Sequence, residues 1–138
     1  MNRVRWLDRR VAAPGPYLAL CLNEQQFAAA CRHIRCTNQP PFVINEWSDA
    51  SAHYFESQRG LTVIVCMRGW EGRHPVEVAG ILVHEAVHVW QEYADRIGET
   101  RPGREQEAYA IQAIAQELMD EFAQQMQAMH DSQRSEKD

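Results

Sequence analysis

The chain of 138 residues carries a formal net charge of -5, and 45% of its residues are hydrophobic and 24% charged. That length suits one domain with a continuous core, and the ordinary composition excludes the disordered and repetitive classes of protein. The negative charge disfavours nucleic acid as the main partner, because nucleic-acid binding usually needs a basic stripe. No stretch of the sequence approaches the roughly 18 apolar residues of a spanning helix, and no targeting segment is recognisable. We therefore expect a cytoplasmic protein that does not bind membranes.

Apolar patterning in the first half predicts a small sheet and one short helix. After an irregular segment over residues 1–16, a helix is expected over 24–34, because apolar residues recur there at helical spacing and Asn23 is a suitable N-cap. The clearest strand signal is 61–67, where β-branched residues dominate, and the residues before it predict a hairpin turn. The predicted strands are 17–22, 42–47, 53–57 and 61–67.

The second half predicts two long helices. The first spans about residues 75–97, with Pro75 at a favourable first position. A turn separates it from a second helix over about 104–129. We predict an α+β fold in which the small sheet packs against both helices. This fold forms a single domain over residues 1–130, followed by a polar, disordered tail over 131–138.

Four cysteines are interpreted as reduced thiols packed in the core, because no export signal favours disulfides. They are Cys21, Cys31, Cys36 and Cys66. His33 lies between two of them, but zinc sites usually take ligand pairs roughly two to four residues apart, and no second pair follows.

The motif HEAVH, residues 84–88, lies within the first predicted long helix. Positions i and i+4 of a helix share one face, so His84 and His88 can bind one metal ion. Glu85 lies one position round the helix, where it can reach water on that ion as a general base. Chance expectation for this pattern in a chain of this composition is about 0.02 occurrences. The alternatives are two core histidines satisfied by hydrogen bonds and an ordinary surface glutamate.

A third ligand is expected from the start of the second long helix, where Glu105 and Glu107 are the candidates. Glu107 continues into an apolar stripe at helical spacing that includes Ile111 and Leu118, so it is predicted to point toward the first helix. Glu105 falls on the more polar side. The alternative is that both acids only favour the helix N-terminus through the backbone dipole. We select Glu107 as the third ligand.

These motifs resemble the gluzincin class of zinc metallopeptidases, in which HExxH supplies two ligands and the base, and a glutamate on a later helix completes the site. Residues 104–109, Arg-Glu-Gln-Glu-Ala-Tyr, are similar to the second motif of that class, where alanine commonly follows the ligand glutamate. The resemblance covers roughly residues 61–125 and implies a minimal zincin-like fold. It implies His84, His88 and Glu107 as zinc ligands and Glu85 as the general base.

Two features depart from the class, and a weaker similarity points to small HExxH proteins of bacterial prophages. Thermolysin-type members carry an aspartate four residues beyond the ligand glutamate, where this chain has Ile111. The C-terminal lobe that supplies a transition-state histidine in larger members has no counterpart after the second helix. These departures bear on catalysis more than on metal binding.

The function we predict is zinc-dependent hydrolysis of a peptide or protein substrate, held as an added strand at a sheet edge near residues 53–57. The donor that stabilises the oxyanion stays open among Tyr54, His53, His74 and Tyr109. One alternative is a non-catalytic zinc site that locks two helices together. Another is a metal-free interaction domain that uses the apolar seam of the last helix.

Overall fold

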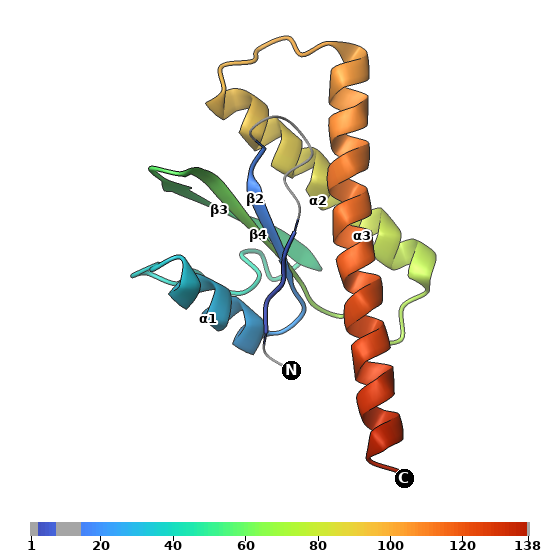
Figure 1. Ribbon diagram of the computed structural model, residues 1–138. Coiled ribbons are helices and arrows are strands. Elements are labelled where there is room, and N and C mark those ends of the chain that lie inside the picture. The colour runs from blue at the N-terminus through green and yellow to red at the C-terminus, as the bar shows by residue number, and fades with distance from the viewer. Residues whose placement is uncertain (1–2, 8–14, 138) are drawn as a thin grey trace.

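A mixed sheet lies at the centre of the protein, with helices packed on both of its faces (Figure 1). Within the described residues, 3–7 and 15–137 of the computed structural model, the sheet has four strands and there are three helices. The strands are β1 (Trp6–Leu7), β2 (Tyr17–Cys21), β3 (Ala50–Ser57) and β4 (Gly60–Met67). The helices are α1 (Glu24–His33), α2 (Pro75–Arg96) and α3 (Arg104–Ser135). The predicted α+β class is confirmed.

The strand order is β1-β2-β4-β3, in which β2 and β4 run parallel and both outer pairs are antiparallel. Residues 61–67 of β4 are all buried, because β4 is a central strand and helices cover both of its faces. Val63 and Val65 pack with α2 and α3 on one face, whereas Ile64 and Cys66 pack with α1 on the other. In this order β3 lies at one edge of the sheet.

Local signals in the sequence explain where several elements begin. The Asn23 side chain accepts a hydrogen bond from the Gln26 backbone at 2.8 Å, so the predicted N-cap of α1 is confirmed. α2 begins with Pro75 at its first turn, as predicted. The predicted hairpin joins β3 to β4, and Gly60 takes a φ of +116° at its turn, a conformation that glycine adopts readily.

The strand predicted at residues 42–47 is wrong, because side chains capture the backbone groups that a strand would need. The Asn45 side chain accepts from the Trp47 backbone N–H at 3.0 Å, which closes a tight turn. The Ile44 backbone N–H donates to the Ser51 hydroxyl at 2.9 Å. Arg68 binds carbonyl oxygens of the same loop, so the segment is an ordered turn just before β3.

The two ends of the described chain also differ from the predictions. Trp6–Leu7 forms the short strand β1 inside the segment that was predicted to be irregular. α3 continues to Ser135 and takes in much of the predicted tail, because side chains such as Gln127 and Asp131 bond at i,i+4 spacing (2.9 Å). Residues 8–14 of the predicted irregular segment, and residue 138 of the tail, lie outside the described residues.

Burial of the cysteines fits the prediction that they pack in the core. Cys21, Cys31 and Cys66 are buried and Cys36 is half-buried, and all four belong to the apolar cluster between α1 and the sheet. Burial raises the pKa of the Cys31 thiol to about 11, so this thiol stays protonated at neutral pH.

α2 lies along the edge strand β3 and is attached near both of its ends. Arg73, just before α2, pairs with Asp49 at 3.0 Å, and Arg96 in the last turn pairs with Glu56. α3 packs against α2 and crosses the same side of the sheet (Figure 1). No described helix, α3 included, is both long enough and apolar enough to span a bilayer.

Candidate metal and catalytic site

His84 and His88 project from an open face of α2 with their ring nitrogens converging. Their Nε2 atoms lie 3.1 Å apart, and both side chains are exposed, so the alternative that they are core histidines is wrong. Two nitrogen ligands held at zinc distance in a tetrahedral site are separated by about 3.3 Å. The pair therefore fits two positions of a metal ion. The same spacing also suits one hydrogen bond between neutral imidazoles.

Gln91 provides an outer partner for one of these histidines. Its side-chain oxygen Oε1 lies 3.1 Å from Nδ1 of His88. In the tautomer whose Nδ1–H donates to this oxygen, Nε2 keeps its lone pair for a metal. Hydrogen bonds of this kind commonly orient histidine ligands and fix their tautomer.

Glu85 lies beside the two histidines but is buried. Its side chain is 6% exposed, so the alternative of an ordinary surface glutamate is wrong. Burial raises the pKa of this carboxyl, and the neighbouring His84 and His88 oppose part of the shift. A carboxylate whose pKa moves toward neutral pH is better suited to accept and return a proton than one in free solution.

A cavity of about 640 Å³ opens between α2 and the edge strand β3, and its wall includes the three motif side chains. Ala50, Ala52 and Tyr54 of β3 form the opposite wall. The two walls of the cavity thus combine two exposed imidazoles and one buried carboxylate with the outer strand of the sheet. The remaining lining residues are Ile44, Trp47, Ser48, Asp49, Ser51, Glu77, Gly80 and Ile81.

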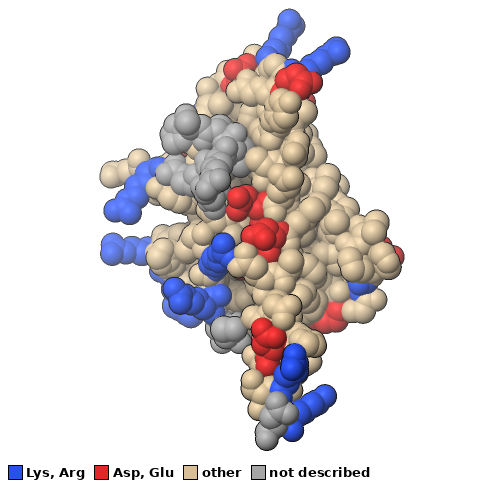
Figure 2. All heavy atoms as spheres, turned by 45° about the vertical axis from the view of Figure 1, so that its right-hand side comes forward, with Lys and Arg blue, Asp and Glu red and all other residues tan. Residues whose placement is uncertain are grey.

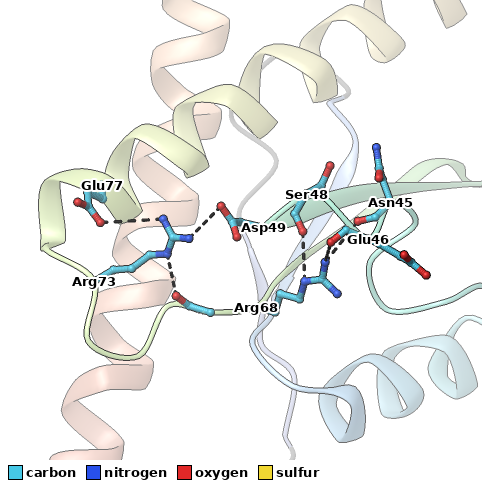
Figure 3. Close-up of polar contacts among 8 residues, drawn as sticks. Asn45, Glu46, Ser48, Asp49, Arg68, Arg73 and Glu77 are labelled. Carbon is cyan, nitrogen blue, oxygen red and sulfur yellow. Dashed lines mark hydrogen bonds and ion pairs between the residues drawn. The ribbon is translucent and has the colours of Figure 1, made fainter.

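Two arginines hold the loop at one end of this cavity (Figure 3). The Arg68 guanidinium donates to the backbone carbonyls of Asn45, Glu46 and Ser48, the last at 3.1 Å. Arg73 pairs with Asp49 at 3.0 Å and lies 4.0 Å from the Glu77 carboxylate. Asp49 and Glu77, the acids that line this end of the cavity, therefore lie beside the positive charge of Arg73.

Of the four residues considered as oxyanion donors, Tyr54 lines the cavity. Burial, with smaller contributions from the Glu92 and Glu85 carboxylates, raises the pKa of Tyr54 to about 12, so its hydroxyl remains a donor at neutral pH. His53 points to the other face of the sheet, stacks on Phe27 and bonds the Phe42 carbonyl oxygen at 2.9 Å. The other two also lie elsewhere: His74 caps the N-terminus of α2, and Tyr109 is exposed on α3.

Glu107 points toward α2, as predicted, but does not reach the histidines. Its Oε2 accepts a hydrogen bond from the indole Nε1 of Trp90 at 2.9 Å. At 100° per residue, Trp90 is rotated by about 240° from His84 and by about 200° from His88 around the helix axis. The carboxylate therefore lies on the opposite side of α2 from the imidazole pair. Glu105, the other candidate, is exposed.

The described residues supply two convergent metal donors and no third. Among residues 3–7 and 15–137, no cluster of three or more histidine, cysteine, aspartate or glutamate side chains is placed to hold a metal ion. The donor set accordingly fits half of a tetrahedral site, and the remaining positions would be open to solvent, substrate or a moved side chain.

Sequence reasoning missed Gln91 and the two arginines, although each has a local signal. Gln91 follows His88 by three positions, which places it on the same helical face. Arg68 directly follows the strongest predicted strand, where its long side chain can fold back over a neighbouring loop. Nothing in the sequence, however, indicates that residues 42–47 form that loop.

The charge distribution on the face that carries α3 is mixed. Among the described residues on this face, acidic side chains are scattered over the centre and several basic side chains gather toward the left edge of the view (Figure 2).

No protein-family model, curated protein or solved structure matches the chain significantly. The geometry of the site is therefore the basis for inferring a function.

Proposed function

We propose that the protein is a metal-dependent peptide hydrolase whose site is the open face of α2. The observation that carries this proposal is the convergence of two exposed imidazoles, 3.1 Å apart, beside a carboxylate that is 6% exposed. A structural pair of histidines needs no buried acid next to it. Burying a carboxyl group costs free energy, and such perturbed groups cluster at functional sites.

His84 and His88 would bind zinc through Nε2, and Gln91 would hold His88 in the required tautomer. When bound there, zinc would lower the pKa of a water molecule and polarise a substrate carbonyl. Among the described residues, the hydrogen bonds of these imidazole nitrogens are with each other and with Gln91.

Glu85 would take the proton from the attacking water and deliver it to the leaving amine. Its burial keeps the carboxylate out of bulk solvent, and its position on α2 keeps it next to both imidazoles. The Tyr54 hydroxyl, protonated at neutral pH, would donate to the carbonyl oxygen as negative charge develops on it.

The edge position of β3 supports an extended peptide as the substrate. Within the described strands β3 pairs only with β4, and its residues Ala50, Ala52 and Tyr54 line the cavity that contains the motif. A peptide that adds to this edge would lie between β3 and α2 with a carbonyl facing the imidazole pair.

The alternative of a zinc lock between two helices has less support. Such a lock would need a ligand from α3 at the imidazole pair, and Glu107 is bonded to Trp90 instead. α2 and α3 already share a buried apolar core that includes Leu82, Ala86, Ile114 and Leu118. The apolar seam of α3 is thus largely used inside the molecule, which also weakens the proposal of a metal-free interaction domain.

The test is hydrolysis of a mixed library of unstructured peptides with added zinc, followed by mass spectrometry. Native protein should cut, and Glu85→Gln should lose about 10²–10⁴-fold in rate while it retains zinc and fold. Asp95→Asn, at an exposed position on the same helix, is the matched control. If native and Glu85→Gln give equal cleavage, a contaminating protease is responsible and the proposal fails.

A further inference from the structure

The loop before β3 carries two large apolar side chains that the proposed reaction does not explain. Trp47 is 91% exposed and Ile44 is 64% exposed, and both line the same cavity as the imidazole pair. We infer that they form a subsite for an apolar side chain of an extended peptide substrate. This inference rests on the proposed function and specifies its substrate class.

The loop is held in place before any ligand arrives. Arg68 binds three of its carbonyl oxygens, as Figure 3 shows, and Arg73 anchors Asp49 at its end. The Asn45 side chain closes the turn that carries Trp47. An indole on a fixed backbone loses little conformational entropy on binding, so its contact with a ligand is worth more than the same contact on a flexible loop.

The geometry also fixes roughly where the apolar residue of the substrate must lie. Tyr54 marks the catalytic end, because it lines the cavity two residues before Glu56, which pairs with Arg96 of α2, and Ala50, the first residue of β3, marks the end nearest Trp47. Four residues of extended strand separate them, about 13 Å. A peptide bound along β3 would therefore place its apolar side chain about four residues from the bond that is cut.

A peptide explains these side chains better than a second copy of the chain. Two exposed side chains bury a few hundred Å² at most, whereas a stable interface needs about 1,000 Å² or more in total. One aromatic anchor beside an open strand edge is instead typical of peptide grooves, where pockets for single side chains give specificity and the strand gives affinity.

Binding is tested in the Glu85→Gln background, so that it is measured without cleavage. Fluorescein-labelled decapeptides would be compared in pairs by anisotropy. The two peptides of a pair are identical except for phenylalanine or serine four residues from a central bond. One pair carries this residue on the N-terminal side of that bond, and a second pair carries it on the C-terminal side. Trp47→Ala should weaken binding of the phenylalanine peptide about tenfold and leave the serine peptide unchanged. Trp47→Phe should restore most of the loss, and Tyr109→Ala, an exposed aromatic on α3, should change neither peptide.

Equal weakening of both peptides by Trp47→Ala would overturn the inference, because the residue would then only support the loop. No change for either peptide would also overturn it, as would a change in oligomeric state without a change in peptide preference. If Trp47 favours the phenylalanine peptide but native protein cleaves no peptide, the subsite is supported and the proposed hydrolysis is wrong. If native protein cleaves peptides but peptide preference does not depend on Trp47, hydrolysis is supported and the subsite is wrong.

Discussion

The two sides of α2 serve different purposes, and comparing them shows what a helical motif can specify. One side presents His84 and His88 to an open cavity, with Glu85 at its margin. The other side is dry and carries Trp90, which is 1% exposed and bonded to Glu107. The spacing of residues within one helix determines that the two imidazoles converge on the first side. The packing of α3 determines the contacts of Trp90 on the second.

This difference explains why the structure brings the two predicted histidine ligands together without Glu107. The i,i+4 rule depends only on helix geometry, so the imidazole pair forms wherever residues 84–88 are helical. The third ligand depends on which side of α2 receives α3. The bulky indole of Trp90 lies on the side that faces α3, and Glu107 satisfies its N–H there.

The largest effect is expected on the packed side. Trp90→Ala removes one of the largest fully buried side chains and should lower the free energy of unfolding by about 3–5 kcal/mol. Urea unfolding followed by circular dichroism measures this. Tyr109→Ala, at an exposed position on α3, should stay within about 0.5 kcal/mol of native protein. A loss in Trp90→Ala as small as the one expected for Tyr109→Ala would mean that the Trp90 side of α2 is not core.

Glu107 should matter for stability and not for metal. Glu107→Ala leaves the Trp90 N–H without its acceptor and should cost about 1–2 kcal/mol in the same unfolding experiment. Glu107→Gln keeps an acceptor oxygen and should cost less. Equal stability of all three proteins would show that the indole contact is not formed in solution.

A smaller effect is expected on the open side. Gln91→Ala frees the Nδ1 atom of His88 and should weaken zinc binding about tenfold, with the free energy of unfolding nearly unchanged. Competition with a chromophoric chelator measures the affinity. Glu92→Ala, its neighbour in sequence, is the control. An unchanged affinity in Gln91→Ala would remove Gln91 from the site.

The smallest effect concerns Glu121 on α3, a buried carboxyl that serves as a comparison for Glu85. Burial raises the pKa of Glu121, opposed by its hydrogen bond from Gln125 and by Arg5. The folded state therefore holds this proton more tightly than the unfolded state, and stability falls as pH rises from the unfolded pKa, near 4.5, through the folded one.

Glu121→Gln removes this titration, so its stability should decline less than that of native protein as pH rises from 4 to neutral. The gain at neutral pH should be on the order of 0.5 kcal/mol. Unfolding curves across this pH range test it. A steeper decline in the variant would mean that the pair with Arg5, 3.8 Å away, outweighs the cost of burial.

Local sequence signals correctly predicted the helix starts, which depend on neighbouring residues. They failed for backbone conformations and contacts that depend on residues far away in the sequence. Asn23 and Pro75 begin their helices as expected, since caps act within one turn. Residues 42–47 have apolar residues typical of a strand, but Arg68 and Ser51 bind their backbone from beyond the segment. The orientation of Glu107 was predicted correctly, whereas the side of α2 that it meets was not.

Zinc content tests the central claim most directly. Native protein, Glu107→Gln and His88→Ala would each be saturated with zinc, passed through a desalting column and assayed for metal per chain, with circular dichroism as a check of fold. The open face of α2 predicts about one zinc in native protein and in Glu107→Gln, and a loss in His88→Ala. No zinc in folded native protein, or an equal loss in Glu107→Gln and His88→Ala, would contradict the account.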